Sequence, residues 1–110
     1  MTSKTTARIA ELNDILRTTF LTGRVLMTEG IRALPDETQS RIVEAVQTFE
    51  AFTPDNDPHG EHDFGALVIE GEKIFWKIDY YAPDMAHGSE DPSDPKQTRR
   101  VLTIMLAEEY

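Results

Sequence analysis

The side chains that could do chemistry gather between residues 53 and 95. All three histidines of the chain lie in this segment, among acidic residues. Imidazole and carboxylate groups can bind a divalent metal, and a histidine oriented by a carboxylate can act as a general base. The candidate metal ligands are His59, Glu61, His62 and His87, and the candidate acid-base residues are His62, Asp63 and Asp79.

The spacing of these residues selects neither a metal nor a reaction. The run His59-Gly60-Glu61-His62-Asp63 lacks the helical His-Glu-x-x-His pattern of zinc proteases and lies among turn residues. A purely structural role stays open, in which His62 and Asp63 only pin a loop to the neighbouring strands. We therefore favour a protein that is not an enzyme and needs no cofactor. Metal-dependent or acid-base catalysis is the alternative.

The negative charge of the chain is concentrated in the same segment. Residues 51–95 hold eleven acidic side chains and two lysines, which equals the net charge of -9 of the whole chain. Such a surface repels phosphate backbones and attracts a basic protein surface. We expect a basic protein partner and no direct nucleic-acid binding, while a loop that serves only solubility is the alternative. The candidate partner-binding residues are Asp55, Asp57, Glu61, Asp63, Asp84, Glu90 and Asp91.

Length and composition set the class of protein. A chain of 110 residues predicts one domain, residues 1–110, with a single core. The absence of cysteine excludes disulfides, thiolate metal sites and a cysteine nucleophile. No apolar run is long enough to span a membrane, and residues 1–8 lack the apolar segment of a secretory signal. We expect a cytoplasmic protein without membrane contact.

The apolar pattern predicts two helices and three or four strands. Apolar residues recur at helical spacing from Ile9 to Phe20 and from Ile42 to Phe49. Thr22-Gly23 offers a left-handed residue to end the first helix, and Val25–Met27 reads as a strand. The run 101–106 is apolar on both faces, which favours an inner strand.

A hairpin forms the centre of the predicted fold. Residues 65–70 and 73–81 flank Gly71-Glu72, and this loop would pair Gly65 with Ile78. Extending that register brings His62, Asp63, Asp79 and His87 toward one end of the sheet. The expected order is α-β-α-β-β-β, an α+β fold with two helices packed on one face of a mostly antiparallel sheet.

Several runs of the sequence resemble an uncharacterised bacterial domain-of-unknown-function family. The resemblance lies in residues 8–14, 52–58, 60–65, 75–81 and 98–110, and so covers nearly the whole chain. It implies a short stand-alone protein of a kind often carried on plasmids and other mobile elements, and it implies no activity. On such an element, the expected role is an inhibitory or counter-defence contact with a host protein.

Overall fold

The computed structural model describes residues 4–110 and has the predicted α+β fold. The helices are α1 (Lys4–Thr19), α2 (Glu29–Arg32), α3 (Asp36–Gln47) and the 3-10 helix η1 (Ala107–Glu109). The strands are β1 (Arg24–Met27), β2 (Phe64–Ile69), β3 (Glu72–Tyr81) and β4 (Arg99–Leu106). In the part of the chain that the structure describes, no helix is long and apolar enough to cross a membrane.

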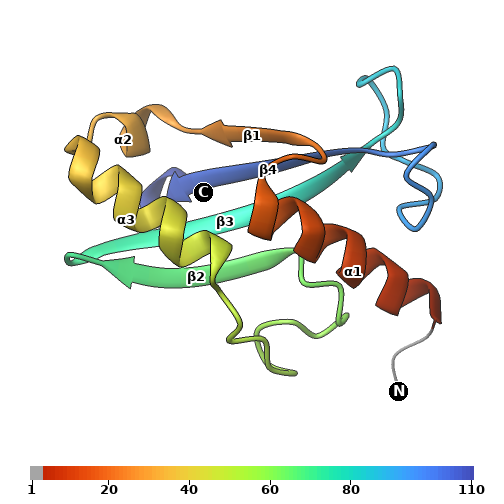
Figure 1. Ribbon diagram of the computed structural model, residues 1–110, viewed down its shortest axis with the longest axis horizontal. Coiled ribbons are helices and arrows are strands. Elements are labelled where there is room, and N and C mark those ends of the chain that lie inside the picture. Colours follow the sequence, from red (N-terminus) through yellow and green to blue (C-terminus); the bar gives the residue numbers. More distant parts are fainter. Residues whose placement is uncertain (1–3) are drawn as a thin grey trace.

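The four strands form one mixed sheet in the order β1-β4-β3-β2 (Figure 1). β4 pairs with β3 in antiparallel and with β1 in parallel orientation, so the run 101–106 is an inner strand, as predicted. Helices α1 and α3 lie on the same face of the sheet (Figure 1), which confirms the predicted layers. The short helix α2, which the sequence pattern does not predict, adds one element to the expected order.

The core lies between this face of the sheet and the two helices. Every second residue of β3 from Ile74 to Ile78 points into it, with Trp76 fully buried between them. Ile42 and Val46, one turn apart on α3, pack against the strands. Burial of such side chains is the main favourable term in the folding of a domain of this size.

The first helix ends at Thr19, four residues before the predicted glycine. Phe20 has a left-handed φ of 60°, and its N–H donates to the carbonyl of Leu16 at 2.7 Å, which closes the last turn. Gly23 has a different role: a Cβ there would lie 2.7 Å from the main-chain oxygen of Arg100. The glycine therefore allows close packing of the chain against β4.

The predicted hairpin loop Gly71-Glu72 is wrong by one residue. The turn residues are Glu70 and Gly71, which both have positive φ, 50° and 82°. Positive φ at both central positions is typical of a type I′ turn, whose twist matches that of the strands. The prediction places Gly71 at the first position of the two-residue loop, whereas in the structure Gly71 occupies the second position, after Glu70.

The corrected turn shifts the register by two residues and pairs Gly65 with Trp76 instead of Ile78. Because side chains alternate along a strand, a shift of two leaves the same residues facing the helices. A Cβ on Gly65 would lie 2.3 Å from Nε1 of Trp76. The indole therefore lies directly over the glycine, and within residues 4–110 its Nε1 has no hydrogen-bond partner.

We expect Gly65→Ala to lower the free energy of unfolding by about 1–3 kcal/mol, because the added methyl group displaces the buried Trp76 indole. Urea denaturation followed by tryptophan fluorescence measures this change. Gly88→Ala is the control, since the nearest atom to its Cβ would be the main-chain oxygen of Tyr80 at 3.9 Å. Equal stabilities of the two variants would contradict the packing of Trp76 on Gly65.

Candidate functional site

The buried face of α1 carries two polar side chains, Asn13 and Arg17. They lie four residues apart and share the face that buries Ile9 and Leu16. Asn13 is fully buried, and the side chain of Arg17 is 4% exposed. A buried amide or guanidinium group destabilises a fold unless it has hydrogen-bond partners. The partners of these two side chains therefore fix how the rest of the chain lies against α1.

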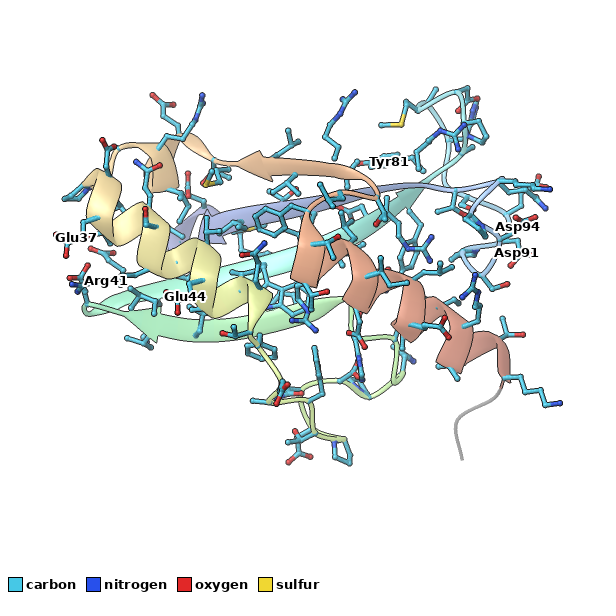
Figure 2. All side chains as sticks on the ribbon, in the orientation of Figure 1. Glu37, Arg41, Glu44, Tyr81, Asp91 and Asp94 are labelled. Atoms are coloured by element: carbon cyan, nitrogen blue, oxygen red, sulfur yellow. The ribbon has the colours of Figure 1, made fainter. Side chains whose placement is uncertain are left out.

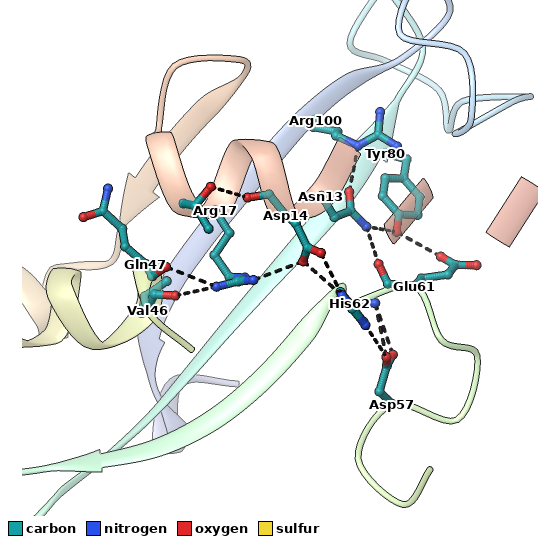
Figure 3. A network of polar contacts seen from close by, with 11 residues as sticks. Asn13, Asp14, Arg17, Val46, Gln47, Asp57, Glu61, His62, Tyr80 and Arg100 are labelled. Atoms are coloured by element: carbon teal, nitrogen blue, oxygen red, sulfur yellow. Dashed lines mark hydrogen bonds and ion pairs between the residues drawn. The ribbon is translucent and has the colours of Figure 1, made fainter. Parts of the chain in front are cut away.

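The amide of Asn13 joins three other parts of the chain (Figure 3). Its Nδ2 donates to the main-chain oxygen of Glu61 at 2.9 Å and to the hydroxyl of Tyr80 at 2.7 Å. Its Oδ1 accepts a hydrogen bond from Nε of Arg100 at 2.7 Å. One side chain thus fastens the loop of residues 48–63, strand β3 and strand β4 to α1, with both amide groups in use.

Tyr80 continues this network toward the loop of residues 48–63. Its hydroxyl donates to Oε1 of Glu61 at 2.9 Å. Burial raises the pKa of Tyr80 above its usual value, and the hydrogen bond from Asn13 acts against that rise. The hydroxyl therefore keeps the proton that it donates to Glu61.

Arg100 connects the same network to the second loop, residues 82–98. Its Nη2 donates to the main-chain oxygen of Pro92, and its guanidinium group lies 5.2 Å from the centre of the Tyr80 ring. Burial lowers the pKa of Arg100 from its usual value. Asn13 and Arg100 together hold both long loops at the same end of the sheet.

His62 fixes the end of the first loop. Its Nδ1 lies 3.0 and 3.1 Å from the two carboxylate oxygens of Asp14 on α1. Its ring stacks on Phe52, with centroids 3.9 Å apart and an interplanar angle of 2°. Its main-chain N–H donates to Oδ1 of Asp57 at 3.2 Å, and its φ of 56° is uncommon for a residue with a side chain. These contacts hold the backbone in that conformation.

The carboxylate of Asp14 also connects His62 to the helix pair. Nη2 of Arg17 donates to Oδ1 of Asp14 at 3.0 Å, and Nη1 donates to the main-chain oxygen of Val46 at 3.1 Å, in the last turn of α3. A cation near a helix C-terminus is favourable because the last carbonyl groups have no partner within the helix. Arg17 and Asp14 therefore link α3, α1 and the first loop in one line of contacts (Figure 3).

The surroundings of His62 bear on its chemistry. Nδ1 contacts Asp14, and Nε2 lies 3.7 Å from Oδ2 of Asp57. A general base needs one ring nitrogen directed at its substrate, and here both nitrogens lie near carboxylates. An open hollow of about 530 Å³ beside the ring is lined in part by Thr18 and His62. The acid-base role of His62 stays a prediction, and these contacts favour a structural role.

The other two residues that the sequence predicts to act with His62 have different partners. Asp79 forms an ion pair with Lys77 at 3.0 Å, and the carboxylate that orients His62 is Asp14 instead. Asp63 directly follows His62, and the pKa of its carboxyl group is raised, first by burial and then by the charge of Glu61. Within residues 4–110, neither Asp79 nor His87 makes a hydrogen bond or an ion pair with His62.

The candidate metal ligands do not meet. His87 pairs with Asp84 at 2.7 Å within the exposed part of the second loop, and His59 is exposed in the first loop. Among residues 4–110, no group of three or more histidine, aspartate or glutamate side chains is placed to hold a metal ion. Of the four candidates, Glu61 and His62 belong to the polar contacts around α1.

Several acidic side chains shape the loops that carry them. Asp84, Asp91 and Asp94 each accept a hydrogen bond from the main-chain N–H two residues further along. Figure 2 labels Asp91 and Asp94 in the second loop. In contrast, the side chains of Asp55 and Glu90 are exposed and make no hydrogen bond or ion pair with the rest of the described chain.

The two network residues on α1, Asn13 and Arg17, are not among the functional residues that the sequence predicts. The apolar stripe of the first helix passes through position 13, where a polar residue interrupts it, and Arg17 follows four residues later. A polar residue at an interior position of an amphipathic helix indicates a buried hydrogen bond. That signal identifies Asn13 as a network residue but does not identify its partners.

We expect Asn13→Ala to lower the free energy of unfolding by about 2–4 kcal/mol, because Arg100 and the Glu61 carbonyl lose a buried partner. Urea denaturation measures the loss, and hydrogen exchange should show faster exchange in residues 48–63 and 82–98. Thr19→Ala, on the exposed side of α1, should change stability by less than about 0.5 kcal/mol. Unchanged loop exchange in Asn13→Ala would refute the proposed anchoring.

Asp63 should make stability depend on pH. A carboxyl group with a raised folded-state pKa destabilises the folded state once it ionises, so this loss develops as the pH rises above the usual value of about 3.9. We expect Asp63→Asn to raise the melting temperature at pH 7 and to leave it nearly unchanged at pH 3. Melting curves of both proteins across this range test the expectation, and an Asp63→Asn protein that is less stable than the parent at pH 7 would contradict it.

Comparison with known proteins places the chain in a family. The model of the family described as "Protein of unknown function (DUF3768)" matches residues 27–109, which include both loops and strands β2, β3 and β4. Helix α1, with Asn13 and Arg17, precedes the matched region. The residues that these side chains contact on other elements, such as Val46 and Arg100, lie within it. No curated protein and no solved structure matches the chain. Because the match covers most of the sequence, the chain belongs to the DUF3768 family.

Proposed function

We propose that the protein is a protein-binding module that presents the acidic segment 53–95 to a basic surface of its partner. The observation that carries this proposal is the way in which the two loops are built. Both loops are tied to the Asn13 network, through Glu61 in one and Pro92 in the other. Each nevertheless keeps an exposed acidic side chain without a partner in the described chain, Asp55 and Glu90.

Fixed loops of this length favour a binding role. Connections longer than about 12–15 residues are uncommon in compact domains and are usually functional or disordered. Residues 48–63 and 82–98 form such connections, and hydrogen bonds within and below them hold each in a defined shape. A loop that is ordered before binding loses less conformational entropy when a partner arrives. This arrangement therefore supports recognition by the loops.

The charge of the segment supports a basic partner. The net charge of -9 lies in the stretch that contains both loops. Electrostatic complementarity of this kind accelerates association and excludes partners of like charge. We further propose that the protein is carried on a plasmid or another mobile element and that the contact inhibits a host protein with a basic surface.

The test reverses the charge of the two unpaired loop side chains. The basic protein lysozyme is the probe, and we expect the double variant Asp55→Lys/Glu90→Lys to bind it about tenfold more weakly than the parent at low salt. Isothermal titration calorimetry at about 0.05 M and 0.3 M salt measures the affinity and its screening.

The control makes the same change of charge away from the loops. Glu29 on α2 and Glu44 on α3 are exposed acidic residues, and Figure 2 shows Glu44 away from Asp91 and Asp94. Glu29→Lys/Glu44→Lys should keep most of the affinity. An equal loss in both double variants would show that only net charge matters, and the proposal would then be wrong.

A further inference from the structure

A cleft at the end of the sheet is lined by arginines and by no acidic residue. It has a volume of about 630 Å³ and lies between the turn before β1, the start of β4 and the loop of residues 82–98. Arg24, Arg99 and Arg100 all line it, although the protein has 20 acidic and only 11 basic side chains. The cleft is thus an uncommon basic surface on this protein.

Two of these arginines lie on the same face of the sheet. Arg24 is opposite Val101 in the parallel pair of β1 and β4, and Arg99 lies two residues before Val101 on β4. Alternate residues of a strand share a face, so the side chains of Arg24 and Arg99 leave the sheet on the same side. Arg100 leaves on the other side, where its guanidinium group contacts Asn13.

Neither Arg24 nor Arg99 has an acidic partner in the described part of the chain. Both are exposed, and across residues 4–110 neither takes part in an ion pair. Nη1 of Arg99 reaches only the carbonyl of Thr98, at 3.4 Å. Asp79, on the same sheet face, is already paired with Lys77 at 3.0 Å. Neighbouring cations repel each other, and an anion bound between them would offset this repulsion.

The rest of the cleft suits a small organic ligand. Met85, Pro95 and Val101 provide apolar surface, and Thr22 provides a hydroxyl group that makes no hydrogen bond with the other described residues. Binding sites for small molecules commonly have volumes of about 300–1,000 Å³ and combine apolar walls with a few polar groups. Guanidinium groups bind phosphate and carboxylate groups through paired hydrogen bonds.

We propose that this cleft binds a small organic molecule that carries an oxyanion group, either phosphate or carboxylate. Arg24 and Arg99 hold the oxyanion, and the apolar part of the molecule lies against Met85 and Pro95. The site uses side chains other than the acidic residues of the proposed protein contact. A failure of one proposal therefore leaves the other unaffected.

The experiment titrates the protein with phenyl phosphate, benzoate and benzyl alcohol and follows the amide shifts of residues 22–24 and 98–101 by NMR. We expect saturable shifts with phenyl phosphate or benzoate, and the tighter of the two identifies the preferred oxyanion. Benzyl alcohol, which has no charge, should bind at least tenfold more weakly. The absence of saturable shifts with both anions would overturn the proposal, as would equal binding of the alcohol.

Matched arginine variants locate the site. Arg24→Gln and Arg99→Gln should each weaken binding of the preferred anion about tenfold, because each removes one charged donor. Arg32→Gln is the control, since Arg32 is also exposed, has no ion pair with the described residues and lies on α2 outside the cleft. Unchanged affinity in Arg24→Gln and Arg99→Gln, with unaltered melting temperatures, would overturn the assignment.

Discussion

The placement of both long loops depends on one buried amide group. Asn13 contacts Glu61, Tyr80 and Arg100, which lie 48 or more residues away along the chain. A buried amide stabilises a fold only while all its hydrogen bonds are made, because each unsatisfied group carries the full penalty of its lost solvation. The network therefore tolerates little displacement of α1 relative to β3 and β4. This constraint explains how loops rich in proline and aspartate are held in shape without disulfides.

The loop of residues 82–98 contributes to two surfaces of opposite charge. Residues 82–98 carry Glu90 on the acidic side, while Met85 and Pro95 form part of the basic cleft. The hydrogen bond from Arg100 to the main-chain oxygen of Pro92 fastens this loop to β4. This contact, together with the hydrogen bonds within the loop, therefore helps to position both surfaces. The fold separates these charges by placing Arg24 and Arg99 on strands and Asp55 and Glu90 on the loops.

The sequence predicts the layers of this fold better than it predicts the turns and the pairing of distant segments. The alternation of apolar and polar residues along the strands identifies the residues that face the helices. This prediction holds although the predicted hairpin loop is wrong, because a register shift of two residues leaves each side chain on the same face of the sheet. The parallel pairing of β1 with β4 depends on contacts between distant segments, which local patterns do not report. Local patterns are equally insufficient for the site. They indicate that His62 and its acidic neighbours in the sequence form a cluster, but the carboxylate that His62 contacts is Asp14, which lies 48 residues earlier on α1.

The parallel pair of β1 and β4 also has a consequence for the order of folding. β1 separates α1 from α2 near the start of the chain, and the strand that it pairs with follows β3 near the other end. In the described sheet β1 is an edge strand that pairs with β4, and β2 and β3 lie beyond β4. The conformational entropy of closing such a loop is lost before the strands pair, which slows folding. Residues 24–27 therefore stay without strand partners until β4 has been synthesised, and the sheet is completed at this edge late in folding.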